Sequence, residues 1–529
     1  MSKRKKRITS LIIAVAILFG ALCAGGVALD VTDGLFKNNT PTYISLNSRT
    51  NGIIESSDDY EAYIFELTGN GALSLCFEHE GFMDSTKSGW TVTLYKIENK
   101  EYKEIAFFES FWSDMTSNWP EVGLGAGTYC VMVEAGLYFL KSEYVLVTNF
   151  TETSTYEREF NDTKETANEI NVGYGKYASS ANRKDSNDTD WFTFEIHEDS
   201  CVNLSFTHPN GNLPQVGWVV TLLNENNEKV TQFAPRLRDA IIKTGAIGLK
   251  AGRYYLSVEA QSEFCKSYTI LVGADKAVNN EFEMNDTTET AIPLPMNFKI
   301  SGCLSERMLG LDKDYYKFTV DGDGYIDIEF THENQNENKN GWNVRVVKTM
   351  SDGSYKEIVR KISKWNQETL RIESLGLSKG EYYILIDGDS VSYNSATYFV
   401  TWSFTEAENF EQEPNSEAVR AMPVEFATYY HGALISSDVS FDEDYYKFEL
   451  KTKTNVSLDF RHEPGDKDEV CWYASIINER NEEMALSKVK LSSEITTTKV
   501  VELPAGTYYV KIETGMYGSE IPYYFRLVR

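Results

Sequence analysis

The chain has 529 residues, enough for roughly three to five domains of ordinary size. Its aromatic content of 13%, with 32 Tyr and 28 Phe against 12 Pro, excludes a disordered chain and favours half-buried strands. The formal net charge of −28 argues against nucleic acid as a partner, because phosphates require a basic surface, and it disfavours anionic membranes.

The N-terminus predicts export from a bacterial-type cell. A basic run at residues 3–7 precedes an apolar run from Ile8 to about Leu22, and small residues follow at 26–28. This is the order found in a signal peptide, and we expect cleavage near Ala28. Residues 1–28 are therefore interpreted as a signal peptide or anchor, and the protein is expected to be secreted or held at the cell surface.

Two alternatives remain for this segment. Residues 8–29 are about long enough to span a bilayer as an uncleaved anchor. Cys23 could instead carry a lipid, although Leu22 before it departs from the usual lipoprotein signal. Cleavage removes five of the 51 Lys and Arg and none of the 79 Asp and Glu, which changes the net charge from −28 to −33. Such a charge suits a soluble extracellular protein that binds cations.

The rest of the chain contains four copies of one pattern. In each copy, apolar residues alternate with polar or small ones up to a His, as expected for a strand with one buried face. A Trp follows ten or eleven residues later, and a Gly-x-Tyr turn then leads into another strand. The segments ending in His are 73–79, 202–208, 326–332 and 456–462, the Trp residues are Trp90, Trp218, Trp342 and Trp472, and the turns begin at Gly127, Gly252, Gly380 and Gly506.

This repeat predicts domains at 29–150, 151–275, 276–405 and 406–529, with the first the most divergent. Many short alternating strands with close turn signals predict an all-β fold, in which each copy is an antiparallel, jelly-roll-like β-sandwich. We expect short helical turns only after the linkers, at 163–167 and 287–291. No pair among the seven cysteines recurs between copies, so no shared disulfide is expected.

Copies two to four open with an acidic motif in which Glu, Glu and Asn follow one another at a spacing of two. Alternate residues of an extended chain project to the same side, so these side chains can converge on one point. A second acidic pair, one residue apart, follows and enters an aromatic strand. The like charges would repel, and Ca²⁺, which takes six to eight oxygen ligands, resolves the conflict. The motifs begin at Glu157, Glu281 and Glu411, and the pairs are Asp188 with Asp190, Asp312 with Asp314, and Asp442 with Asp444.

The alternative to a cation site is an acidic linker exposed to solvent, or a linker whose Asn and Asp residues cap a helix. A single occurrence would favour that interpretation, whereas three occurrences in register favour a cation. Ser416 stands in copy four where copies two and three have Asp162 and Asp286, which predicts a weaker site there. The first copy keeps only Asp59 and Glu61, which predicts no tight site.

The Glu-x-Glu-x-Asn-Asp-Thr opening, the Asp-x-Asp entry to a strand and the Gly-x-Tyr-Tyr strand resemble the bacterial pre-peptidase C-terminal domain family. That family includes the collagen-binding domains of clostridial collagenases. The resemblance is clear in copies two to four and loose in copy one. It implies β-sandwiches that act as accessory or substrate-binding modules of secreted proteases. It also implies that the acidic opening binds Ca²⁺, which orders the linker against the sandwich.

By this resemblance the Ca²⁺ sites consist of Glu157, Glu159, Asn161, Asp162, Asp188 and Asp190 in copy two, and of Glu281, Glu283, Asn285, Asp286, Asp312 and Asp314 in copy three. The corresponding residues of copy four are Glu411, Glu413, Asn415, Asp442 and Asp444. Two features depart from the family: no protease precedes these domains, and the repeated His and Trp match no known family function. Collagen binding is not carried over, because the collagen-contacting surface has no match here.

The repeated His and Trp allow two interpretations. Trp could stack on sugar rings or peptide with His alongside, or His could cap a buried strand while Trp packs in the core. Because each His lies on the buried register of its strand, the second is favoured.

No catalytic apparatus is recognised. The His-Glu-x-x-His and Gly-x-Ser-x-Gly motifs are absent, and the signal and four copies leave no segment for a catalytic domain. We therefore expect a non-catalytic adhesion or accessory protein that binds an extracellular polysaccharide or matrix protein through four weak sites acting by avidity. The alternative is a structural spacer or envelope-assembly protein without a specific ligand, and a hydrolase is least favoured. A membrane contact is expected only through an uncleaved N-terminus.

Overall fold

The computed structural model describes residues 40–81, 87–181, 183, 188–209, 211–261, 267–305, 312–350, 353–388, 394–435 and 441–529. The predicted signal peptide or anchor lies outside these residues, as do Cys23 and Cys265. The five cysteines within the described part, Cys76, Cys130, Cys201, Cys303 and Cys471, are free thiols. Among the described helices, none is long and apolar enough to cross a membrane.

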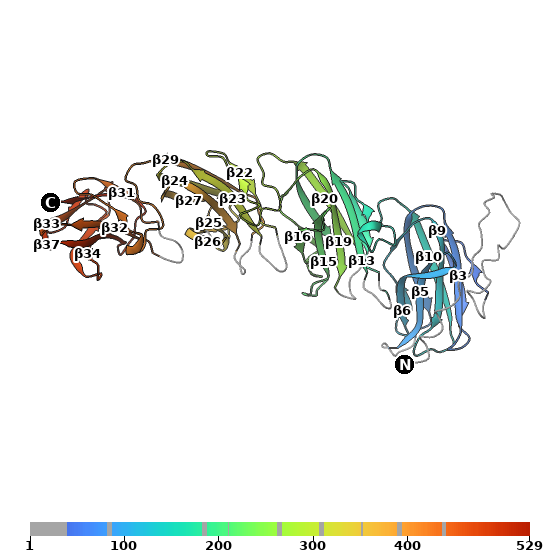
Figure 1. Cartoon of the computed structure of the whole chain (residues 1–529). Coiled ribbons are helices and arrows are strands. Elements are labelled where there is room, and N and C mark those ends of the chain that lie inside the picture. The colour runs from blue at the N-terminus through green and yellow to red at the C-terminus, as the bar shows by residue number, and fades with distance from the viewer. Residues whose placement is uncertain are drawn as a thin grey trace. The chain divides into compact units, whose positions relative to one another are not determined.

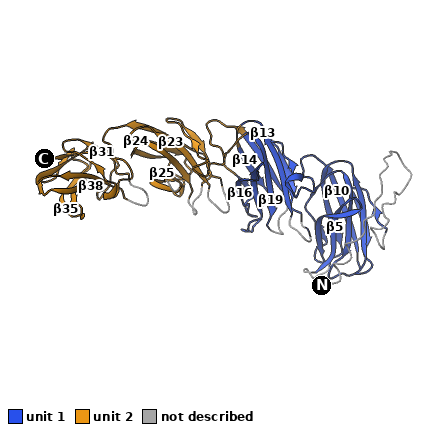
Figure 2. Ribbon diagram, in the orientation of Figure 1, with its two compact units in different colours: residues 1–198, 202–243, 251–274 blue, residues 199–201, 244–250, 275–529 orange. Residues whose placement is uncertain are grey.

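The chain forms two compact units (Figure 2). The first consists of residues 1–198, 202–243 and 251–274, and the second of residues 199–201, 244–250 and 275–529. The sheets of copy one and most of copy two belong to the first unit. Those of copies three and four, with a short part of copy two that includes 244–250, belong to the second.

Each copy is a sandwich of two β-sheets, as the alternating pattern predicts (Figure 1). In copy one the sheets have the strand orders β1-β3-β9-β5-β6 and β2-β10-β4-β7, with β8 also paired to β4. Strands β2 to β5 alternate between the sheets, and β9 and β10 insert between earlier strands, which is jelly-roll connectivity. The two-residue β1 runs parallel to β3. The strands are β1 (Thr42–Tyr43), β2 (Ser48–Ile53), β3 (Tyr60–Leu67), β4 (Gly71–His79), β5 (Ser88–Glu98), β6 (Glu101–Phe111), β7 (Thr116–Asn118), β8 (Val122–Leu124), β9 (Gly127–Ala135) and β10 (Glu143–Glu152).

Copy two repeats this connectivity with the orders β11-β13-β19-β15-β16 and β12-β20-β14-β17. Its short first strand again pairs in parallel. The expected helical turn at 163–167 is the 3₁₀ helix η1 (Lys164–Thr166). The strands are β11 (Asn168–Glu169), β12 (Gly175–Ser179), β13 (Thr189–Ile196), β14 (Ser200–Thr207), β15 (Trp218–Asn224), β16 (Lys229–Phe233), β17 (Ile241–Lys243), β18 (Ile247–Leu249), β19 (Gly252–Ala260) and β20 (Ser267–Lys276).

Copy three has the orders β21-β23-β28-β25-β26 and β22-β29-β24-β27. At 287–291 the chain forms a hydrogen-bonded turn, in which the Thr290 amide donates to the Thr287 carbonyl over 3.2 Å, rather than a helix. The strands are β21 (Ile292–Pro293), β22 (Ile300–Gly302), β23 (Lys313–Val320), β24 (Gly324–His332), β25 (Asn340–Thr349), β26 (Tyr355–Lys364), β27 (Thr369–Leu377), β28 (Gly380–Asp387) and β29 (Tyr398–Glu406).

Copy four has the orders β30-β32-β38-β34-β35 and β31-β39-β33-β36, with β37 also paired to β33. A 3₁₀ helix, η2 (Ala418–Arg420), stands where η1 stands in copy two. The strands are β30 (Met422–Pro423), β31 (Tyr430–Gly432), β32 (Glu443–Leu450), β33 (Thr454–His462), β34 (Val470–Asn478), β35 (Glu483–Lys490), β36 (Ile495–Thr497), β37 (Val501–Leu503), β38 (Gly506–Thr514) and β39 (Tyr523–Val528).

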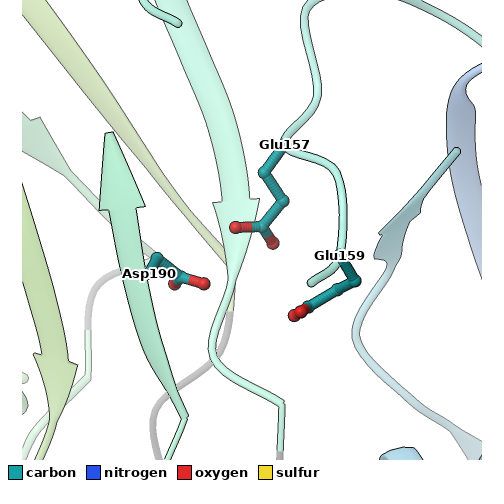
Figure 3. Close-up of side chains that lie close together, drawn as sticks. All are labelled: Glu157, Glu159 and Asp190. Carbon is teal, nitrogen blue, oxygen red and sulfur yellow. The ribbon is translucent and has the colours of Figure 1, made fainter. Parts of the chain in front are cut away.

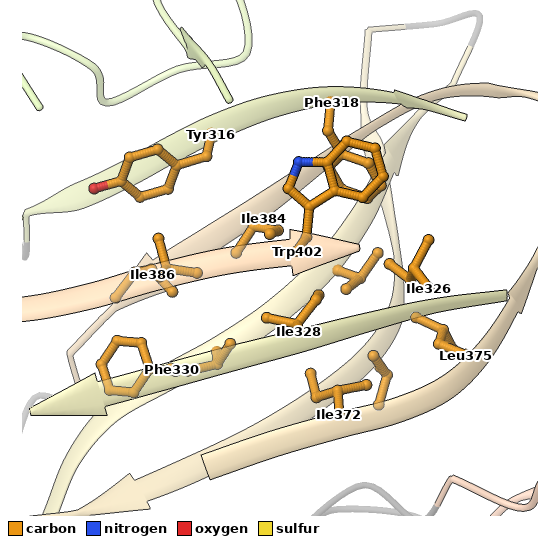
Figure 4. Close-up of a cluster of buried hydrophobic side chains, with 14 of the residues drawn as sticks. Tyr316, Phe318, Ile326, Ile328, Phe330, Ile372, Leu375, Ile384, Ile386 and Trp402 are labelled. Carbon is orange, nitrogen blue, oxygen red and sulfur yellow. The ribbon is translucent and has the colours of Figure 1, made fainter. Parts of the chain in front are cut away.

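The inward faces of the two sheets form the core of each copy. Figure 4 shows this for copy three, where Ile326, Ile328 and Phe330 alternate along β24 and are fully buried. They pack against residues of the facing sheet, among them Tyr316 and Ile384. The period of two read from the sequence is therefore the period of this core.

The repeated His and Trp are structural. Trp342 is 1% exposed and its ring lies 4.2 Å from that of His332, measured between centroids. The His332 ring nitrogens hydrogen-bond to the Glu333 carbonyl at 2.8 Å and to the Ser363 hydroxyl at 3.1 Å. Equivalent buried pairs occur in the other copies, so these Trp rings offer no surface to a ligand; the pairs are His79 with Trp90, His208 with Trp218 and His462 with Trp472.

Candidate cation sites at the domain junctions

The acidic motifs of copies two, three and four each pair through the backbone with a residue of the preceding copy. The Glu159 amide donates to the Gly123 carbonyl over 3.0 Å, so that copy two is joined to β8 of copy one. The same bond recurs from Glu413 to Gly376 over 3.0 Å. At the start of copy three, Glu283 donates to the carbonyl of residue 248 over 2.9 Å. The motif therefore lies at the junction itself, as its position in the sequence predicts.

A glycine makes this close approach possible. A Cβ atom on Gly123 would lie 2.2 Å from the Glu157 carbonyl oxygen, and one on Gly376 would lie 2.3 Å from that of Glu411. Gly248 has even less room, because its Cβ would lie 1.8 Å from a backbone oxygen. Any larger residue would force the motif away from the strand that it pairs with. Copy four has Glu502 at this position.

The first glutamate of each motif is fixed at both carboxylate oxygens. In copy two, Glu157 Oε1 accepts a hydrogen bond from the Ser179 amide at 2.6 Å, and Oε2 accepts one from the Asn161 side chain at 3.2 Å. The amide donors in the other copies are Cys303 to Glu281 and Ala433 to Glu411, and the side-chain donors are Asn285 and Asn415. The side-chain carbonyl of each Asn is thereby directed away from its own glutamate.

The aspartate pair comes from the start of the strand that follows. Asp188 accepts from the Ala181 amide at 2.6 Å, and Asp190 accepts from the Tyr268 hydroxyl at 2.6 Å. The corresponding amide donors are Ser305 to Asp312 and Ile435 to Asp442, and the tyrosine donors are Tyr398 to Asp314 and Tyr523 to Asp444. One oxygen of Asp190, Asp314 and Asp444 is thus held by a tyrosine, and the other accepts no hydrogen bond from the described residues. The first aspartate of each pair is held more fully, because the second oxygens of Asp312 and Asp442 accept the amides of the residues that follow them.

Three-residue subsets of the predicted acids converge. The carboxylates of Glu157, Glu159 and Asp190 point into one space, with ligand atoms within 4.8 Å of one another (Figure 3). The same limit holds for a second triad, Glu159 with Asp162 and Asp188. In copy three the group equivalent to the second triad is Glu283, Asp286 and Asp312, and in copy four the group equivalent to the first triad is Glu411, Glu413 and Asp444. Buried acidic clusters that could hold metal ions are therefore present in copies two, three and four.

Buried oxygen atoms at repeated positions of these sites have no hydrogen-bond donor among the described residues. In copy two they are Glu159 Oε1, Asn161 Oδ1 and Asp190 Oδ1, each buried and each without a hydrogen-bond partner among the described residues. The equivalent atoms of Glu413, Asn415 and Asp444 in copy four are also buried and accept no hydrogen bond from the described residues. The same is true of the equivalent atoms of Asn285 and Asp314 in copy three. Leaving a buried polar atom unpaired costs about 1–3 kcal/mol, so these repeated oxygens are the ones that a bound cation could satisfy.

Burial and mutual repulsion raise the pKa values of the clustered acids. Burial, followed by the charges of Glu159 and Asp188, holds the pKa of Glu157 well above its usual range. Burial likewise raises the pKa of Glu281 to about 7 and that of Glu411 to about 8. At neutral pH these carboxylates therefore need a proton or a cation between them to remain buried together.

The ligand atoms that converge in these clusters are all oxygens, from carboxylates and the Asn amide. Hard cations such as Ca²⁺ prefer this donor set, whereas softer metals take nitrogen or sulfur. Copy one differs, because Glu61 takes the place of the second aspartate and accepts hydrogen bonds from Tyr63, at 2.6 Å, and from Tyr144. Among the described residues, no acidic group that could hold a metal falls in copy one.

The sequence interpretation missed three parts of these sites. The glycines of the docking strands could have been found, because residues 123, 248 and 376 are Gly while the same position of copy four is Glu502. The tyrosine that binds the second aspartate gave no signal beyond the general abundance of aromatic residues. Arg183, which contacts the outer acids of copy two, lies between β12 and β13 and matches no motif of the sequence analysis.

No protein-family model and no curated protein matches the chain. Among solved structures, the pre-peptidase C-terminal domain of a Bacillus anthracis collagenase is similar at 20% identity, over 20% of this chain and 93% of that one, with a TM-score of 0.17. A triple jelly-roll turret protein of an archaeal virus is similar at 7% identity, over 68% and 89%, with a TM-score of 0.19. A Clostridium perfringens M60 catalytic domain with two CBM51 domains is similar at 10% identity, over 93% and 56%, with a TM-score of 0.15. Likenesses at this level identify neither a family nor a function.

The raised pKa values predict how stability depends on pH without metal. A carboxyl group whose pKa is higher in the folded than in the unfolded chain binds more protons when folded, so stability falls as pH rises from the unfolded value of about 4.5 through 7–8. In chelator, the melting temperature should therefore be lower at pH 8 than at pH 6. Excess Ca²⁺ should remove or reverse this difference, and a metal-free melting temperature that rises between pH 6 and pH 8 would contradict the assignment.

The docking glycine offers a second prediction. Gly376→Ala should push the motif of copy four off β27 and expose the linker, because its Cβ overlaps the Glu411 backbone. Limited proteolysis with mapping of cleavage sites should show faster cutting at 405–415 while the other linkers are cut at the wild-type rate. Glu502→Ala is the matched control, since it changes the same position of copy four. Equal cutting in both variants would show that this contact does not hold the junction.

Proposed function

We propose that this chain is a non-catalytic extracellular binding or accessory protein, related to the pre-peptidase C-terminal domains, whose junctions are stiffened by Ca²⁺. The observation that carries the proposal is the recurrence of one arrangement at each junction. The same Asn and Asp oxygens are left without donors beside the glutamate whose amide pairs with the preceding copy. Binding a cation at these oxygens and ordering the linker are therefore one event.

Several features support Ca²⁺ over a proton as the resident partner. Each cluster combines carboxylates with the side-chain carbonyl oxygen of an Asn. Protonating the acids does not satisfy this oxygen unless a carboxyl hydrogen is donated to it, whereas a cation can bind it together with the carboxylates. The donor set is large enough for the six to eight ligands that Ca²⁺ takes, with water completing the shell. Extracellular modules use such sites at millimolar Ca²⁺, which fits the export expected from the N-terminal segment.

The non-catalytic part of the proposal rests on repetition. The buried acids recur in copies two, three and four with the same structural hydrogen bonds, and each set lies at a domain junction. Tandem arrays commonly repeat binding or spacer modules, whereas a complete active site in every module is unusual. The carboxylates are accordingly given a structural role.

Exposed apolar loops favour a binding protein over an inert spacer. In copy one the loop between β9 and β10 exposes Leu137 by 81%, together with Tyr138 and Leu140. In copy four the corresponding loop between β38 and β39 exposes Met516 by 76%, together with Tyr517. The corresponding loops of copies two and three, at 262–266 and 389–393, lie outside the described residues. Apolar and aromatic groups repeated at one loop are typical of recognition surfaces.

The junction part of the proposal is tested by solution scattering of the secreted chain in Ca²⁺ and in chelator. The maximum dimension or the flexibility should change on chelation, because the linkers lose their shared charge partner. Glu413→Gln with Asp444→Asn should reproduce part of this change in Ca²⁺, whereas Glu61→Gln in copy one should not. Identical profiles in Ca²⁺ and chelator, together with no calorimetric Ca²⁺ binding, would contradict the proposal.

The binding part is tested on an array of glycans and matrix proteins, with and without Ca²⁺. Changing both Tyr138 and Tyr517 to Ser should reduce retention by at least about tenfold, because avidity multiplies weak sites by about 10²–10⁴. Tyr174→Ser, at a residue 73% exposed outside these loops, should leave retention unchanged. No retention of any polymer above background would favour the spacer.

A further inference from the structure

Three acids of copy two, Glu159, Asp162 and Asp188, contact the positively charged side chain of Arg183. The guanidinium of Arg183 donates to Asp162 at 2.6 Å and to Glu159 at 3.1 Å, and it lies 3.0 Å from Asp188. Its side chain is only 10% exposed. Arg183 therefore neutralises part of the negative charge of these three candidate ligands without any metal.

The same arginine also reaches the preceding copy. Its Nε donates to the carbonyl oxygen of Ile105 on β6 at 3.1 Å, and the guanidinium carbon lies 5.5 Å from the ring centroid of Phe160. Arg183 thus connects the acidic cluster of copy two to the backbone of copy one. This connection is separate from the bond between Glu159 and Gly123.

The sequence shows that the arginine and its aspartate occur together. The amide of residue 181 binds the first aspartate of the pair, and in copies three and four residues 305 and 435 do the same. Two positions further on, the residues are Arg183, Arg307 and Ser437. The sixth position of the motif is Asp162 in copy two, Asp286 in copy three and Ser416 in copy four. Arg307 and Ser437 lie outside the described residues, so only their sequence positions are compared.

Because the arginine and the aspartate at the sixth position occur together, the net charge of the cluster is the same in copies two, three and four. In copy two the motif and the aspartate pair carry five carboxylates, and the arginine reduces the charge to −4. Copy three has the same residue types at these positions. Copy four lacks both members of the pair and has four carboxylates, which again gives −4. The aspartate at the sixth position is therefore balanced by the arginine and adds no net charge for a metal to neutralise.

We infer that Asp162 and Arg183 form a metal-independent tie between copies one and two, and that Asp162 is a positioning residue rather than a metal ligand. The junction before copy two then keeps its order when metal is removed, whereas the junction before copy four, which lacks the pair, depends on metal. The ion pair of Lys361 with Glu520 at 2.7 Å also joins copies three and four, but Glu520 is 44% exposed and such pairs contribute little. The difference between the two junctions in their response to metal removal rests on the proposed function, whereas the contact between Asp162, Arg183 and copy one does not.

Hydrogen exchange of the full secreted chain in chelator and in Ca²⁺ tests this inference. In wild type, chelation should speed exchange at 411–417 by at least about tenfold and change exchange at 157–163 much less. Arg183→Gln should speed exchange at 157–163 in chelator by at least about tenfold, because three acids lose their counter-charge. Arg158→Gln, an exposed arginine in the same motif, is the matched control and should have no such effect.

A double variant, Asp162→Ser with Arg183→Ser, separates charge from the tie. It reproduces the residue types of copy four and restores the charge of −4, so Ca²⁺-dependent protection at 157–163 should persist while protection in chelator is lost. The double variant also keeps the inference testable if Arg183→Gln fails to fold. Wild-type protection at 157–163 in chelator in both variants would overturn the tie. If Ca²⁺ altered protection in none of the three junctions of wild type, the proposed function would fail, and the chelator result for Arg183 would still decide the tie.

Discussion

Carboxylates buried close together at a domain junction repel one another, and the rest of the structure is arranged around this repulsion. Glu157, Asp188 and Asp190 are each less than 3% exposed, and burial alone disfavours their charged forms. Backbone amides, a tyrosine hydroxyl and an Asn side chain each satisfy one oxygen of these acids. The second oxygen of Asp190 and Oε1 of Glu159 accept no hydrogen bond from the described residues, and a positive charge near them offsets the repulsion at neutral pH.

One short segment of the chain forms both the junction and the charge cluster. The backbone of the motif pairs with the preceding copy at a glycine, while its side chains, two residues apart, face the cluster. Neutralising the side chains therefore holds the backbone against the neighbouring sandwich. In copy two an internal arginine supplies part of the positive charge, and in copy four the two positions involved are both serine. Both arrangements leave the same net charge of −4 on the cluster.

The fold was predictable because it depends on local patterns. Alternation along 326–332 and its equivalents predicted the core strands, and the repeat predicted four sandwiches. The acids that converge were predictable from spacing, because residues two apart in an extended segment share a side. The close approach at Gly376 and the bond from Tyr268 to Asp190 were not, because they depend on how jelly-roll connectivity brings distant segments together. The family resemblance places Asp162 among the metal ligands, whereas its contact with Arg183 depends on the three-dimensional fold.

Calorimetric titration of Ca²⁺ into the metal-free secreted chain tests the central claim most directly. The account predicts saturable binding with about one equivalent or more for each cluster of copies two, three and four, accompanied by release of protons near neutral pH, because the clustered acids have raised pKa values. Absence of binding at millimolar Ca²⁺, in a chain shown to be folded, would contradict it.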